Sequence, residues 1–211
     1  MLLTRQLPLS AARDNMRRLV LIRVIALLGQ LVGIVFAWIY LEAVLNYGLM
    51  LLVVLMLTLV TITSLWRLQR SWLVTDAEYF GQLLFDVVAL TLLLYLSGGS
   101  TNPFISYYLV ILTICAATLP WSYTWCMAGI TIAAYSSLLF YYQPLQLPDQ
   151  DMAVMSHGRF FNLHVLGMWL TFVISALLIT YFVVKMAQAI RQQEADLAAQ
   201  RETTLHDEQL L

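Results

Sequence analysis

The sequence has very little charge. Of its 211 residues only 11% are Asp, Glu, Lys or Arg, whereas 61% are hydrophobic. About 25% of the residues of a typical soluble domain are charged. No basic cluster interleaves with aromatic residues, as it would on a face that binds nucleic acid, and the net charge is −1. The composition therefore predicts an integral membrane protein without a nucleic-acid partner.

Patterns that bind metal are also scarce. The two cysteines, Cys115 and Cys126, lie inside apolar stretches, where a thiol usually packs as a small side chain. No Cys-x-x-Cys or Cys/His spacing typical of zinc sites occurs. A cluster after residue 148 consists of Asp149, Asp151, His157, Arg159 and His164. Its spacing fits no tight metal motif, so we interpret it as part of a solvated loop, and Glu42 as a helix-end residue.

Long apolar runs dominate the rest. A membrane-spanning helix needs about 20 apolar residues, and six runs approach this length: 19–40, 47–66, 80–96, 104–119, 123–140 and 164–185. The first is too long for the apolar part of a signal peptide and lacks a cleavage site. Thr75-Asp76-Ala77-Glu78 is a capping box that opens the third helix. We expect an all-α membrane protein with six transmembrane helices.

Basic residues indicate the orientation of these helices. With six spans, ten of the eleven fall on one side of the membrane: Arg5, Arg13, Arg17, Arg18, Arg23, Arg67, Arg70, Lys185, Arg191 and Arg201. Only Arg159 falls on the other side. Because Lys and Arg accumulate on the cytoplasmic side, both termini are predicted to be cytoplasmic, and residues 97–103 to face outward.

The character of the chain changes after Lys185. Residues 186–211 are rich in Ala, Gln, Glu and Arg and lack Gly and Pro, which is typical of a soluble helix. Apolar or small residues recur every seven positions from Ile190, but Gln193, Gln200 and Asp207 lie between them, so the coiled-coil pattern is weak. We therefore divide the chain into a cytoplasmic segment (1–18), a six-span domain (19–185) and a cytoplasmic linker helix (186–211) leading to a further region.

The turn between the third and fourth runs, Ser97-Gly98-Gly99-Ser100-Thr101-Asn102-Pro103, has two interpretations. In the first it only connects two helices. Gly98 is suited to a left-handed position after a helix. Asn102 is a good N-cap, and Pro103 a good first helical residue.

In the second interpretation the turn binds a quinone. A quinone headgroup needs a few hydrogen-bond donors between aromatic or aliphatic walls near the membrane surface. The backbone of Gly98 and Gly99 is open to close approach, and a helix N-terminus adds positive potential. The side-chain donors would be Ser100, Thr101 and Asn102, and the ring walls Tyr95, Phe104, Tyr107 and Tyr108.

The segment Gly98-Gly99-Ser100-Thr101-Asn102-Pro103-Phe104 matches the heptapeptide GGxxNPF at all five fixed positions. In this it resembles the RegB/PrrB family of redox sensor histidine kinases, which includes RoxS-type proteins, and the resemblance covers essentially the whole chain. It implies that ubiquinone or ubiquinol binds at the heptapeptide as the signal ligand. It also implies a homodimer in a bacterial inner membrane, with residues 97–103 periplasmic, and in full-length form a cognate response regulator and a respiratory oxidase as partners.

The family's kinase region has no counterpart in the sequence. His206 has no adjacent Glu, so we do not assign it as a phosphoacceptor, and we expect no kinase activity from this chain alone. The alternative function is a small transporter or membrane enzyme, or a scaffold without a redox ligand. A transporter would need polar groups from several helices converging near the midplane.

Asp86 is a carboxylate inside an apolar run, which is costly in a membrane and marks a candidate functional residue. Arg23 lies at a similar depth in the first run. We expect the two to form a structural pair, or Asp86 to bond to hydroxyls, with a proton-coupled role as the alternative. About 15 Å of helix separates Asp86 from the turn, so it is not expected to touch a headgroup bound there.

Overall fold

The computed structural model describes residues 9–39, 45–69, 75–143 and 163–208. Throughout this part the chain forms helices joined by turns, without strands, which confirms the all-α prediction. The helices are α1 (Leu9–Ile39), α2 (Tyr47–Gln69), α3 (Asp76–Leu96), α4 (Tyr107–Thr118), α5 (Trp121–Phe140) and α6 (Leu163–Glu208). Two short 3-10 helices, Gly99–Thr101 and Pro103–Ser106, fill the turn between α3 and α4.

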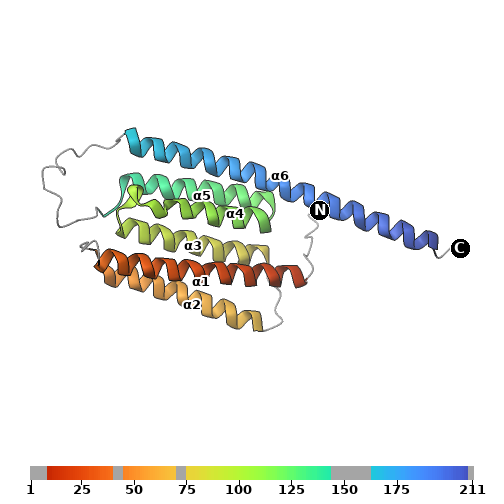
Figure 1. Cartoon of the computed structure of the whole chain (residues 1–211), viewed down its shortest axis with the longest axis horizontal. Helices are drawn as coiled ribbons and strands as arrows, with labels where there is room; N and C mark the ends of the chain where they lie inside the picture. Colours follow the sequence, from red (N-terminus) through yellow and green to blue (C-terminus); the bar gives the residue numbers. More distant parts are fainter. Residues whose placement is uncertain (1–8, 40–44, 70–74, 144–162, 209–211) are drawn as a thin grey trace.

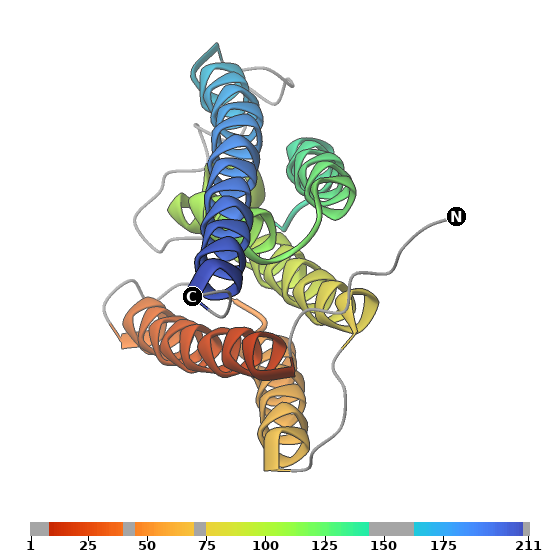
Figure 2. The ribbon, with the colours of Figure 1, turned by 90° about the vertical axis from the view of Figure 1, so that its right-hand side faces the viewer.

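The helices form an elongated bundle (Figure 1). Along its cross-section α1 packs on α2, α2 on α3, α3 on α4 and α5, and these two on α6. The view along the bundle shows α1 and α2 at one side and α6 at the other (Figure 2). α1 makes most of its close backbone contacts with α2, and it meets α3 and α4 mainly through side chains such as Arg23, Leu27 and Gln30.

Among the described residues, five helices are long and apolar enough to cross a membrane: those containing Asn15–Ile39, Tyr47–Gln69, Asp76–Leu96, Trp121–Phe140 and Val165–Leu197. The segment Pro103–Thr118 is shorter. Its 3-10 helix of 4 residues and α4 of 12 residues extend over roughly 25 Å, less than the ~30 Å hydrocarbon core of a bilayer. The six-span count is therefore not confirmed, and it stays a prediction for this segment.

Two clusters of buried side chains hold the bundle together. The larger joins α3, α4, α5 and α6 with the first part of α1 and includes Met16, Tyr108, Tyr135 and Phe172. The smaller joins α1, α2 and α3 and includes Leu27 and Val54. The outward faces carry many exposed Leu, Val, Ile and Phe side chains, as expected of a surface that contacts lipid.

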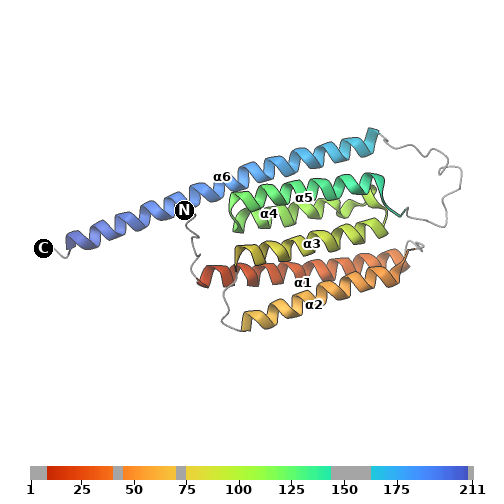
Figure 3. The same cartoon turned by 180° about the vertical axis from the view of Figure 1, so that it is seen from behind.

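The last helix is much longer than the bundle. α6 has 46 residues, about 70 Å of helix, and it projects beyond the end of the bundle opposite the 3-10 turns (Figures 1 and 3). Ile190 and Leu197, in the C-terminal half of α6, are exposed. The role of this half as a cytoplasmic linker, its coiled-coil pairing and the sidedness of the termini remain predictions.

Candidate functional site

The turn between α3 and α4 has the backbone that its glycines favour. Gly98 has φ 103° and Gly99 φ 63°, both in the left-handed region, which other residues adopt only with strain. The Ser97 amide donates to the Leu94 carbonyl at 3.1 Å, and the Asn102 amide to the Gly99 carbonyl at 3.2 Å. The connecting role predicted for Gly98 is thus present.

Asn102 braces the turn from both sides. Its Oδ1 accepts from the Phe104 amide at 3.0 Å, which caps the helix beginning at Pro103. Its Nδ2 donates to the Ser97 carbonyl at 2.9 Å and to the Ser97 Oγ at 2.8 Å. Thr101 Oγ1 donates to the Gly98 carbonyl at 3.2 Å. A ligand would have to displace these bonds to use the donors that the sequence suggests.

Substitution of Asn102 by Ala is therefore expected to lower the free energy of unfolding by about 1–2 kcal/mol, because it removes an N-cap and two further bonds. Asn102→Asp, which keeps the cap acceptor and loses the donors, should cost less. Thr113→Ala is the control, since its hydroxyl only bonds within α4, to Leu109. Thermal unfolding in lipid nanodiscs compares the stability of wild type and the three variants. Equal stability of wild type and Asn102→Ala would show that Asn102 does not stabilise the turn.

The inner face of the turn is covered by the end of α5. Gly98, Gly99 and Ser100 are buried. A Cβ placed on Gly99 would lie 2.3 Å from the Tyr142 Cβ, and the Tyr135 hydroxyl donates to the Ser100 carbonyl at 3.5 Å. On this side the glycine backbone is packed against protein, so any ligand approaches from the other side.

The predicted ring walls lie on different sides of α4. Tyr108 is fully buried between α3 and α6, where its hydroxyl is 2.7 Å from Thr91 Oγ1 and its ring meets Phe172 edge-on. Phe104 and Tyr107 lie on the side toward α1: the Phe104 side chain is 54% exposed, while Tyr107 is half-buried. The structure therefore brings Phe104 and Tyr107 together and separates them from Tyr108.

Phe104 and Tyr107 belong to a line of contact that we call the α1–α4 seam (Gln30 and Gly33 on α1; Phe104 on the 3-10 helix before α4; Tyr107 and Ile111 on α4). The Phe104 ring reaches within 3.6 Å of the position of a Cβ on Gly33. Gln30, Tyr107 and Ile111 line one cavity further along. Residues spaced by three or four lie on one face of a helix, so the seam runs from the turn toward the middle of the bundle.

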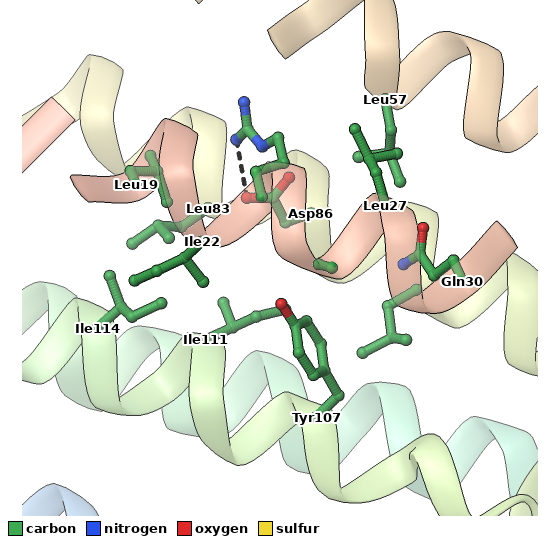
Figure 4. A pocket seen from close by; sticks show the side chains of 13 residues that line it. Leu19, Ile22, Leu27, Gln30, Leu57, Leu83, Asp86, Tyr107, Ile111 and Ile114 are labelled. Carbon is green, nitrogen blue, oxygen red and sulfur yellow. Dashed lines mark hydrogen bonds and ion pairs between the residues drawn. The ribbon is translucent and has the colours of Figure 1, made fainter. Parts of the chain in front are cut away.

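That cavity has a volume of about 30 Å³ and lies between α1, α3 and α4 (Figure 4). Arg23 and Asp86, whose similar depth in the sequence suggested a pair, form an ion pair at its edge, with Arg23 Nη2 2.7 Å from Asp86 Oδ2. Arg23 also donates to the Gln82 carbonyl at 3.2 Å and to Gln82 Oε1 at 3.3 Å. Ser64 Oγ on α2 donates to the same Oε1 at 3.0 Å.

Three buried polar atoms around this cavity have no hydrogen-bond partner within the described residues: Arg23 Nε, Gln30 Oε1 and Asp86 Oδ1. Buried polar atoms without a partner are rare, and Arg23 Nε and Asp86 Oδ1 belong to the same ion pair. The sequence analysis did not single out Gln30 or Gln82. The sequence does indicate them indirectly, because both lie inside apolar runs, where burying a polar side chain costs free energy.

The structure does not describe the side chains of the residues considered for a metal site. Asp149, Asp151, His157 and Arg159 lie outside the described residues, as does Glu42, and for His164 only the helical backbone is described. Elsewhere, in the part of the chain that the structure covers, no three His, Cys, Asp or Glu side chains come together to hold a metal ion.

No family model matches this sequence, and no solved structure matches it. Among curated proteins it is similar to the sensor histidine kinase RegB of Cereibacter sphaeroides, with 30% identity over 185 residues. The match covers 88% of this chain and 39% of RegB, so the chain spans about two fifths of the length of that relative. This chain is therefore a relative of the sensor histidine kinase RegB and matches the N-terminal region of that family, as its GGSTNPF motif predicted.

Proposed function

We propose that this chain is the membrane sensor domain of a histidine kinase and that its ligand is ubiquinone or ubiquinol. The observation that carries the proposal is the similarity to RegB along 88% of the chain, in a protein with apolar, membrane-length helices. The redox state of the quinone pool would pass to a cytoplasmic kinase, which phosphorylates a response regulator. Dimerisation would pair two copies of the chain.

The quinone ring is proposed to bind in the α1–α4 seam, beside the turn. Phe104 and Tyr107 offer aromatic faces there, and the Phe104 side chain is exposed on the outer surface of the bundle. A quinone carries flat apolar faces and a long isoprenoid tail, and the tail could leave the seam directly into lipid. In this proposal the GGSTNPF turn sets the start of the 3-10 helix before α4 and thereby the orientation of Phe104.

A signal requires two states of the protein that the oxidised and reduced ligands stabilise differently. α4 packs closely against α6, and α6 projects beyond the bundle (Figure 3). A ligand that shifts α4 in the seam would therefore act on α6 directly. This gives the proposed sensor a short mechanical route from the quinone to the far end of the chain.

Phe104→Ala is expected to weaken the binding of a short-chain ubiquinone roughly three- to tenfold, because it removes one aromatic contact worth about 0.5–1.5 kcal/mol. Stability should change little, since this side chain is 54% exposed. The measurement is quenching of intrinsic fluorescence during titration of the protein in nanodiscs. Phe182→Ala is the matched control, because Phe182 is 64% exposed on α6, away from the seam. If Phe104→Ala and Phe182→Ala bind the ubiquinone with equal affinity, the quinone does not bind in the seam.

One observation favours the transporter alternative. Arg23, Ser64, Gln82 and Asp86 form a polar network contributed by α1, α2 and α3, and such convergence inside a membrane bundle is typical of transport sites. The cavity beside it, at about 30 Å³, has room for only one or two water molecules. We therefore prefer the sensor function.

A further inference from the structure

The buried side of α6 carries two aromatic contacts with the rest of the bundle. Phe172 on α6 packs between Tyr108 on α4 and Tyr135 on α5. Its ring centroid lies 6.1 Å from that of Tyr108 at an interplanar angle of 73°, and 4.9 Å from that of Tyr135 at 90°. Both contacts have the edge-to-face geometry that aromatic rings prefer. All three side chains are buried, and we call them the aromatic clamp (Tyr108, Tyr135 and Phe172).

Each tyrosine of the clamp is held by its hydroxyl group to a residue outside the clamp. The Tyr108 hydroxyl lies 2.7 Å from Thr91 Oγ1 on α3. Thr91 gives its own hydrogen to the Val87 carbonyl at 2.7 Å, so Tyr108 is the donor in this bond. The Tyr135 hydroxyl donates to the carbonyl of Ser100 in the GGSTNPF turn at 3.5 Å, a long bond that a small shift of either group breaks. One ring thus connects the clamp to α3, and the other connects it to the turn.

Phe172 has no polar atom, so its position follows from the two rings beside it. In a close-packed core a displaced ring finds no empty space, and its neighbours have to move with it. A shift of the Ser100 carbonyl therefore acts on Phe172 through Tyr135. A shift of α4 at the seam acts on Phe172 through Tyr108, because Tyr108 directly follows Tyr107 in the chain. Both routes reach α6 at the same residue.

A second contact between α5 and α6 lacks this connection to the turn. Trp169 Nε1 on α6 donates to Ser136 Oγ on α5 at 3.0 Å. Ser136 in turn donates to the Ile132 carbonyl, within α5, at 2.7 Å. This bond holds α6 against α5 one turn away from Phe172, so it provides a matched control for the clamp.

We propose that Phe172 is the positioning residue that couples the GGSTNPF turn to α6. The turn sets the position of Tyr135, and Tyr135 together with Tyr108 sets that of Phe172. From Phe172 the chain continues as one helix without proline to Glu208, and proline is the usual cause of a sharp kink. As the regulation of α6 by a ligand, this coupling rests on the proposed sensor function, whereas the coupling itself is present without a ligand.

The experiment measures hydrogen exchange of the α6 backbone amides in the ligand-free protein in nanodiscs, with Asn102→Ala as the change that loosens the turn. In the wild-type background we expect Asn102→Ala to raise exchange at residues 170–176 about three- to tenfold, the effect of losing roughly one hydrogen bond of restraint. In a Phe172→Leu background the same change should raise exchange only about twofold or less. In a Trp169→Phe background it should keep its full effect.

Tyr135→Phe serves as a second variant if Phe172→Leu does not fold, because it keeps the ring against Phe172 and removes only the hydroxyl that reaches the turn. In its background the rise at α6 should fall to about half or less, and an undiminished rise there overturns the coupling. An equal rise in the Phe172→Leu background, or no rise at α6 in the wild-type background, overturns it as well.

Two further outcomes would also overturn the coupling. An equal rise at residues 50–61 of α2 would show that Asn102→Ala loosens the whole bundle. Loss of the rise in Trp169→Phe would show that any contact between α5 and α6 has the same effect. Because these measurements need no ligand, failure of a short-chain ubiquinone to bind would overturn the sensor function and leave the coupling standing.

Discussion

Asp86→Ala is expected to lower the free energy of unfolding by about 3–5 kcal/mol, which is the range for breaking a buried ion pair from one side. Arg23 is 4% exposed and makes its 2.7 Å ion pair with Asp86. Without the carboxylate, a guanidinium remains among apolar helices with only the Gln82 oxygens as partners. The measurement is equilibrium unfolding in bicelles or nanodiscs.

The double variant Arg23→Leu, Asp86→Ala should be more stable than Asp86→Ala alone, because it removes the unpaired charge together with its partner. A double-mutant cycle then gives a coupling energy of the two residues. Glu78→Ala is the matched control: Glu78 pairs with Arg67 through a bond of 2.6 Å, but both side chains are more exposed. Its loss should cost about 1 kcal/mol or less. Additive effects at Arg23 and Asp86 would show that the pair does not form.

Gly99→Ala is expected to lower the free energy of unfolding by at least ~2 kcal/mol. Its φ of 63° already strains any residue with a Cβ. In addition the new Cβ would lie 2.3 Å from the Tyr142 Cβ and 2.5 Å from its Cγ. The Tyr142 Cβ is fixed by the backbone, so rotation of the tyrosine side chain cannot relieve its contact with the new methyl group. Thermal unfolding measures the effect.

Two further variants test the cause. Gly129→Ala adds the same methyl inside α5, where nothing lies within 4 Å of it, and it should leave stability unchanged or raise it, since Ala favours helix over Gly. Gly99→Ala combined with Tyr142→Gly removes the clashing atoms and should recover part of the loss. If Gly99→Ala melts like wild type, the contact between the turn and the end of α5 is absent.

The turn could be predicted from the sequence because local chemistry determines it. A left-handed Gly98, a capping Asn102 and a Pro103 that begins a helix follow from rules that involve only neighbouring residues. The sequence also placed Arg23 and Asp86 at one depth. These predictions needed the spacing along helices and nothing about how the helices pack.

The seam could not be predicted, because it depends on how α4 is rotated about its axis. Tyr107 and Tyr108 are adjacent and chemically equal, yet one faces α1 and the other is buried against α3 and α6. In a soluble helix a polar stripe indicates the outward face, whereas both faces of α4 are apolar. Gln30 was missed for a related reason: a lone amide in an apolar run indicates a polar contact without identifying the partner.

The ion pair that joins α1 to α3 has a consequence for how the protein is made. Arg23 is synthesised 63 residues before Asp86, so α1 enters the membrane while its charge still lacks a partner, at a cost of about 2.5–3.5 kcal/mol on an insertion scale. α1 and α2 contact each other closely and can assemble first as a hairpin. The charge of Arg23 in this hairpin is paired only after α3 has inserted and brought Asp86 beside it. We therefore expect the stable insertion of α1 to require the insertion of α3, because α3 supplies the partner of Arg23.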